Sequence, residues 1–79
     1  MELSKSRTDL EILTHNLLWI RRHYGYSRKK MVGILNIGVG SLSKLERGEI
    51  PPRLRVDFLF AVYDHFRIPP SVLLSKWME

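Results

Sequence analysis

Residues 26–48 constrain the fold more than any other stretch, because two short helical patterns there flank a tight turn. Ser27 is a good N-cap for the first helix, which we expect over residues 28–35. The apolar residues at helical spacing in it are Met31, Val32 and Leu35. Asn36 interrupts this pattern, and Asn tolerates the left-handed backbone conformation that a sharp turn needs.

A second helix is expected over residues 39–47, with Gly38 before it and Gly48 after it. Ile37 can fill the corner between the two helices. The expected inward face of the second helix consists of Ser41, Leu42 and Leu45. Two helices that cross through such a turn form a helix-turn-helix, a unit that can place its second helix in the major groove of DNA.

Most of the chain, from about residue 17 to residue 74, resembles the Cro/C1-type helix-turn-helix family of the lambda and 434 repressors. The residues at the family's signature positions are Arg21, Gly25, Ser27, Met31, Val32, Asn36, Ile37, Leu42, Leu45, Glu46, Arg47 and Gly48. The segment LERGEIPP resembles the family's acidic residue and Gly before a Pro-containing loop. The resemblance implies an all-α, lambda repressor-like DNA-binding domain.

The bulk composition narrows the function classes further. The 79 residues suffice for one domain, and the absence of cysteine excludes disulfides, thiolate metal sites and thiol nucleophiles. A net charge of +5 is compatible with nucleic acid, an acidic membrane or an acidic partner. No apolar run approaches the ~20 residues that span a membrane, and the N-terminus lacks an apolar signal core. We therefore expect a cytoplasmic, nucleoid-associated protein.

The N-terminal part predicts a long amphipathic helix over residues 9–24, after a frayed arm at residues 1–7. Thr8 and Glu11 fit a capping box at its start. Its inward stripe is expected to contain Leu10, Leu13, Leu17, Ile20 and Tyr24. A second, partial stripe either meets a partner or the N-terminal arm or consists of ordinary exposed residues: Ile12, Trp19 and His23.

The C-terminal part predicts two more helices, and the whole chain a compact five-helix bundle without strands. The fourth helix begins between residues 53 and 56 and ends near residue 66, after an extended Pro-containing loop. Its inward face is predicted to be Val56, Leu59, Phe60, Tyr63 and Phe66. The fifth helix is expected over residues 69–79, because Pro69 and Pro70 suit a first helical turn.

Three cations in the first turn of the 28–35 helix indicate a site: Arg28, Lys29 and Lys30. Exposed cations at a helix N-terminus are unfavourable by ~0.3–1 kcal/mol each, whereas a DNA phosphate there would be attracted by both the helix and the side chains. The alternative is a solvated basic face. The predicted DNA-binding set is Ser27, Arg28, Lys29, Val39, Gly40, Ser41, Ser43, Lys44, Arg47 and Arg53.

The resemblance assigns base reading to the positions of Val39, Gly40 and Lys44, and a backbone contact to that of Arg28. Valine can pack on a thymine methyl group, Gly40 allows close approach, and Lys44 reads guanine, contacts a phosphate or is solvated. Part of the specificity can then come from DNA shape. The resemblance also implies an ion pair between Arg21 and Glu46 that fixes the recognition helix to the first helix.

The leading hypothesis is a sequence-specific regulator of transcription that binds double-stranded DNA as a homodimer. The fifth helix either folds fully onto its own bundle or supplies the dimer contact through Val72, Leu74, Trp77 and Met78. The alternative is an antitoxin or adaptor with a protein partner, supported by the apolar residues Ile12, Trp19, Phe58 and Val62. A non-specific nucleoid binder is a third hypothesis. No enzyme motif, cofactor site, metal site or small-molecule effector domain is predicted.

Overall fold

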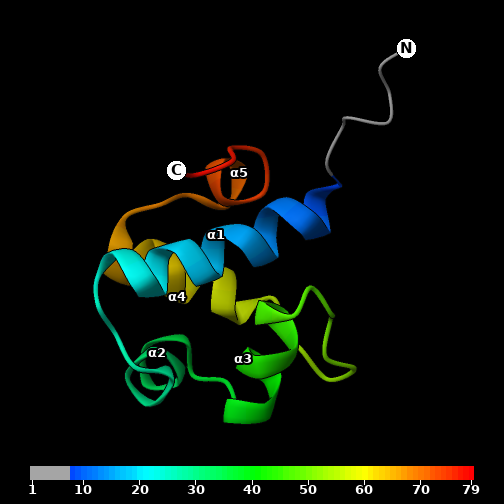
Figure 1. Ribbon diagram of the computed structural model, residues 1–79, viewed down its shortest axis with the longest axis vertical. Helices are drawn as coiled ribbons and strands as arrows, with labels where there is room; N and C mark the ends of the chain where they lie inside the picture. The colour runs from blue at the N-terminus through cyan, green and yellow to red at the C-terminus, as the bar shows by residue number, and fades with distance from the viewer. Residues whose placement is uncertain (1–7) are drawn as a thin grey trace.

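The computed structural model describes residues 8–79, and all the regular secondary structure in this range is α-helical (Figure 1). The helices are α1 (Asp9–His23), α2 (Arg28–Leu35), α3 (Val39–Glu46), α4 (Asp57–Phe66) and α5 (Pro70–Leu73). Figure 1 shows α2 and α3 on one side of α1, and α5 on the other. The all-α bundle of five helices is as predicted. The expected arm at residues 1–7 lies outside the described residues.

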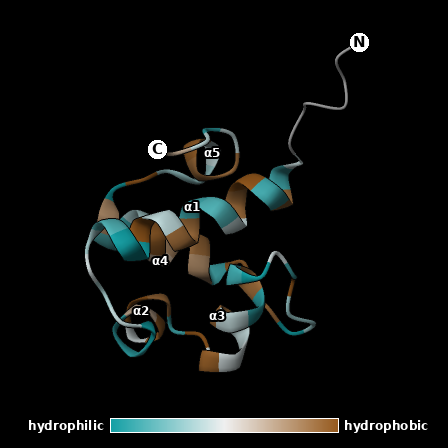
Figure 2. Cartoon of the chain, in the orientation of Figure 1, coloured by the Kyte–Doolittle hydropathy of each residue, from teal (hydrophilic) through white to brown (hydrophobic). Residues whose placement is uncertain are grey.

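Helix α1 begins at the predicted capping box. The hydroxyl of Thr8 accepts from the Glu11 amide at 3.1 Å, and the Glu11 carboxylate accepts from the Thr8 amide at 2.8 Å. Brown and teal alternate along the helix in Figure 2, as an amphipathic helix requires. The middle of the predicted stripe, Leu13, Leu17 and Ile20, is buried. The last member, Tyr24, is 47% exposed, because the helix ends at His23 and Tyr24 is its C-cap.

The α2–turn–α3 stretch forms as its sequence predicts. The hydroxyl of Ser27 caps α2 by accepting from the Lys30 amide at 3.1 Å. Asn36 ends α2 in the left-handed conformation (φ 58°), and its amide donates to the Val32 carbonyl at 2.8 Å. The side chains of this stretch that join the core are Met31, Leu35, Leu42 and Leu45.

The predicted inward face of α4 is wrong for three of its five residues. Val56, Phe60 and Tyr63 are exposed, whereas Phe66 is buried and Leu59 is half-buried. Apolar residues lie on both faces of the DFLFAVYDHF helix, so the spacing does not determine which face turns inward.

Two side chains that had been assigned to a partner surface fill the core instead. Phe58 and Val62 are 3% and 0% exposed and pack in the same cluster as Phe66. They therefore give no support to a docking surface for another protein. The side chains that α4 leaves exposed are those of its opposite face.

The predicted helix over residues 69–79 is also wrong, because α5 ends at Leu73 and the chain turns back onto α1. Buried Asn16 holds this segment: its amide nitrogen donates to the carbonyls of Leu73 (2.8 Å) and Lys76 (2.6 Å). Its amide oxygen accepts from the Met78 amide at 3.0 Å. These bonds satisfy backbone groups that the short helix leaves unpaired.

His15 adds a second set of contacts to the C-terminal segment. Its Nε2 donates to the Met78 carbonyl at 2.6 Å, and its ring stacks on Trp77 with centroids 3.5 Å apart. Met78 is buried in its own core, so it cannot belong to the exposed dimer patch expected of it. Val72, Leu74 and Trp77 are half-buried.

Within residues 8–79, none of the helices has both the length and the apolar character needed to cross a bilayer.

Replacing Asn16 by Ala should destabilise the protein by about 3 kcal/mol, because three backbone groups would lose their hydrogen-bond partner, in two cases from a buried bond. The matched control is Ser75→Ala, which removes an exposed hydroxyl bond to the Ser71 carbonyl and should cost less than about 0.5 kcal/mol. Urea denaturation followed by circular dichroism measures both values. If Asn16→Ala and Ser75→Ala lowered the free energy of unfolding by the same small amount, Asn16 would not be an anchor of the C-terminal segment.

Candidate nucleic-acid interface

The orientation of α3 is set by the carboxylate of Glu46, at its C-terminal end. This side chain is only 4% exposed. Arg21 of α1 binds it with two nitrogens, Nε to Oε2 at 2.6 Å and Nη2 to Oε1 at 3.2 Å. A third nitrogen of the same guanidinium, Nη1, donates to the Tyr26 carbonyl at 3.1 Å. The ion pair that the resemblance implied is thus present, and it ties α3 to α1 and to the start of α2.

Arg28, at the first position of α2, binds the same carboxylate. Its Nε donates to Oε1 of Glu46 at 3.0 Å, while 55% of the side chain stays exposed. The sequence does not predict this contact, because the two residues are 18 positions apart and no spacing rule connects them. Arg28 therefore has a structural partner besides the DNA phosphate predicted for it.

The α3 outer surface, which we define as Val39, Gly40, Ser41, Ser43 and Lys44, is the part of α3 turned away from the core. Val39 is 53% exposed and Gly40 is exposed, whereas the other three are half-buried. A Cβ atom built on Gly40 meets nothing within 4 Å. Packing within the described structure therefore does not require glycine at this position.

Further cations lie at the start of α2, the helix that packs beside α3. Lys29 and Lys30 are exposed, and the first turn of α2 contains no acidic residue. The ammonium group of Lys30 lies 5.6 Å from the ring centroid of Tyr26, a cation–π distance. Ser27 is exposed, but its hydroxyl is already engaged as the N-cap. The predicted DNA-binding residues of α2 and α3 thus lie on two helices that pack against each other.

The loop after α3 contributes the remaining predicted cations. Arg47 is exposed and lies 3.5 Å from the carboxylate of Glu49, a surface ion pair that is weak in water. Arg53 is exposed as well. Arg55, two positions after Arg53, forms a surface ion pair with Asp57 at 3.1 Å. Arg53 thus makes no ion pair within residues 8–79, whereas the charge of Arg47 is partly balanced.

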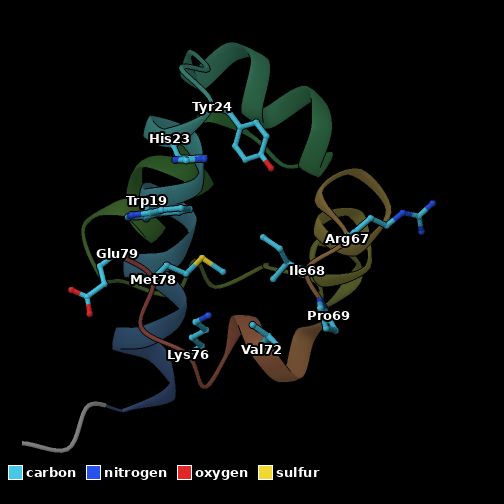
Figure 3. Close-up of a pocket in the computed structure, with 10 residues that line it drawn as sticks. All are labelled: Trp19, His23, Tyr24, Arg67, Ile68, Pro69, Val72, Lys76, Met78 and Glu79. Carbon is cyan, nitrogen blue, oxygen red and sulfur yellow. The ribbon is translucent and has the colours of Figure 1, made fainter.

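A separate hollow of about 370 Å³ lies between the end of α1 and the α4–α5 connection (Figure 3). The stacked rings of Trp19 and His23 form one wall, and Ile68, Pro69 and Val72 form the other. Residues 8–79 contain no group of three or more His, Asp or Glu side chains arranged to hold a metal ion. Arg67, Lys76 and Glu79 also line the hollow, so it offers charged groups beside the apolar and aromatic side chains.

Comparisons of the chain with protein-family models, with curated proteins and with solved structures found no match. The proposals for function therefore depend on the geometry and chemistry of the chain itself.

The three-residue cluster around Glu46 predicts unequal couplings in two double-mutant cycles. The Arg21–Glu46 cycle should give a coupling free energy of about 1–3 kcal/mol, because both side chains are largely buried and the contact is bidentate. The Arg28–Glu46 cycle should give less than about 1 kcal/mol, because Arg28 is half exposed. Urea denaturation of the single and double Ala variants supplies the data. Additive effects in the first cycle would contradict a clamp between α1 and α3.

Proposed function

We propose that the protein is a sequence-specific regulator of transcription that binds double-stranded DNA through a helix-turn-helix formed by α2 and α3. The proposed fold is of the lambda repressor-like type. The observation that carries the proposal is an α3 outer surface that begins with exposed Val39 and Gly40, on a helix held at its other end by the buried Glu46 carboxylate. A recognition helix needs both properties, because it must fit the groove and must keep its angle to the rest of the domain.

The size and chemistry of α3 suit the major groove, which admits one α-helix. The methyl groups of Val39 can pack against a thymine methyl, and the hydroxyls of Ser41 and Ser43 can donate to or accept from base edges. Lys44 can donate to guanine O6 and N7, and Gly40 allows the helix backbone to approach the DNA closely. With few hydrogen-bonding side chains on α3, we infer that DNA shape supplies part of the specificity.

The charge distribution supports contact with the phosphate backbone. The chain carries a net charge of +5, and Lys29 and Lys30 are exposed at the N-terminus of α2. Helix N-termini attract anions, so a phosphate there interacts with the amides and the ammonium groups together. Arg28 can contribute through its exposed half while its Nε remains on Glu46. Such contacts would position the domain, whereas α3 would read the bases.

The second candidate function is an antitoxin or adaptor whose main partner is another protein. The observation in its favour is that Val39 and Gly40, at the start of α3, carry no hydrogen-bonding side chain. The burial of Phe58 and Val62 removes two of the residues that had suggested a partner surface. DNA binding is therefore the better supported of the two, and the two functions are compatible.

Selection of duplexes from a random pool tests the proposal directly. The full-length protein should enrich an inverted repeat whose half-sites are ~10 bp apart, centre to centre, because a two-fold dimer places two recognition helices one DNA turn apart. Recovery of unrelated sequences with equal affinity would favour a non-specific nucleoid binder. Recovery of no duplex at all at low salt would contradict DNA binding.

Gly40→Ala should stabilise the free protein by about 0.5–1 kcal/mol and weaken binding to the selected duplex at least tenfold. The stabilisation follows because the added Cβ meets open space in the free protein, and the loss follows because it would meet DNA. The control is Gly33→Ala in α2, where a Cβ also meets nothing within 4 Å. It should stabilise equally without changing affinity. Stabilisation with unchanged affinity at both positions would contradict close approach at Gly40.

Lys29→Ala should weaken binding to selected and unrelated duplexes alike and reduce the log–log salt slope by about one unit, because one phosphate contact is lost. Lys44→Ala should instead relax the preference at one or two base pairs of each half-site. Lys76→Ala removes the same charge from an exposed position in the C-terminal segment that Asn16 binds, and it serves as the control. Fluorescence anisotropy over a salt series measures all three. If Lys76→Ala lowered the salt slope as much as Lys29→Ala, the affinity for DNA would depend on net charge and not on a contact at Lys29.

A further inference from the structure

Helix α4 is apolar on both faces, but the chain itself covers only one of them. We define the α4 outer face as Val56, Phe60 and Tyr63, which are 65%, 61% and 43% exposed and follow one another at helical i, i+4, i+7 spacing. The opposite face places Phe58 and Val62 in the core. The helix also carries exposed Asp57 and Asp64, so its solvent side is mixed in polarity. Residues 8–79 of one copy leave the three apolar side chains of the outer face exposed.

We propose that a second copy of this chain covers the α4 outer face, in a two-fold symmetric dimer. The part of this inference that concerns DNA, namely that the dimer presents two α3 helices to one operator, rests on the proposed function. The part that concerns the interface rests on the shape, charge, area and position of the outer face.

The shape of the outer face is self-complementary. Beside Phe60 lies a hollow of about 510 Å³, bounded by α4 and by the turn between α2 and α3. Asn36 and Ile37 of the turn and Ala61 of α4 are among the residues that line it. In a two-fold interface each copy offers the same surface, so a projecting side chain and a hollow must both be present on it. Phe60 is such a projection, and it stands next to the hollow that its counterpart would enter.

The charges around the outer face are of both signs. Asp57 and Asp64 line the hollow, where Arg55 pairs with Asp57 at 3.1 Å. Arg67 lies at the C-terminal end of the helix, with its guanidinium carbon 5.6 Å from the ring centroid of Tyr63. A surface with carboxylates and guanidinium groups can meet its own copy without a net repulsion, because opposite charges are available on each side.

The exposed area fits the centre of a dimer interface. Aromatic side chains offer about 150–250 Å² each, so the exposed fractions of Val56, Phe60 and Tyr63 amount to roughly 300 Å² per copy. A stable interface buries about 800 Å² per partner, with the apolar part at its centre and a polar rim. A contiguous apolar patch of about 300 Å² is comparable to the largest patch on a typical monomer, and such a patch is often functional.

The position of the face favours it over the C-terminal segment as the dimer contact. The hollow beside Phe60 includes residues of the α2–α3 turn, so pairing through α4 keeps both α2–α3 units near the symmetry axis. The C-terminal segment lies across α1 from α2 and α3, and its Met78 is buried (Figure 1). Two recognition helices in one operator must be only ~34 Å apart.

Sedimentation equilibrium of the full chain without DNA tests the interface. The wild type should be a dimer at tens of micromolar, and Phe60→Ser should weaken association at least tenfold, because it removes the central side chain. Val39→Ser, an equally exposed apolar residue on α3, should leave association unchanged. Thermal unfolding should show that both variants are folded, because neither side chain belongs to the core.

Several outcomes would overturn the proposal. These are a monomeric wild type, a Phe60→Ser variant that associates like the wild type, or an equal loss of association in Val39→Ser. Dissociation by Leu74→Ser but not by Phe60→Ser would place the interface on the C-terminal segment. Fluorescence anisotropy with the selected duplex separates the two proposals. A protein that is monomeric and binds the duplex would contradict the α4 interface but not the proposed function. A protein that is dimeric and binds no duplex would contradict the proposed function but not the interface.

Discussion

The buried carboxylate of Glu46 is the interaction on which the arrangement of the first three helices depends. It is bound by Arg21 from α1 and by Arg28 from α2, so one anionic group connects all three helices. A carboxylate taken out of water is costly unless it is paired with good geometry and further hydrogen bonds, and here both guanidinium groups supply them. Because a bidentate contact fixes direction as well as distance, it determines the angle at which α3 leaves the core. The apolar side chains beneath α3 add stability but little directional preference.

A second polar anchor lies on the other side of α1. Buried Asn16 satisfies the backbone of the segment after α5, while His15 holds the same segment through the Met78 carbonyl and the Trp77 ring. This anchor holds the segment after the four-residue α5 against α1. Helix α5 packs on both α1 and α4, yet the α4 outer face stays exposed.

The sequence predicted the local features well and the long-range ones unevenly. Thr8, Ser27 and Asn36 have positions that backbone chemistry nearly dictates, so the starts of α1 and α2 and the turn before α3 were predicted correctly. The inward face of α4 was not, because apolar residues on both faces make the spacing ambiguous and only packing decides. Likewise, apolar residues after Leu73 suggested a helix, whereas hydrogen bonds from Asn16, more than 55 positions away, determine the path. The polar Asn16 between Leu13 and Leu17 was the one local signal of that contact.

The proposed function requires that the Arg21 and Arg28 contacts to Glu46 hold α3 at an angle that lets its outer surface enter DNA. The most direct measurement is a titration of the ¹⁵N-labelled protein with a selected duplex, followed by amide NMR. The largest shift changes should fall on residues 39–44 and 27–30, while the amide of Glu46 and the Arg21 side-chain Nε–H signal stay nearly constant, because the clamp is already formed in the free protein. Changes concentrated on α5 and the C-terminal segment, or loss of the Arg21 Nε–H signal on binding, would contradict this model.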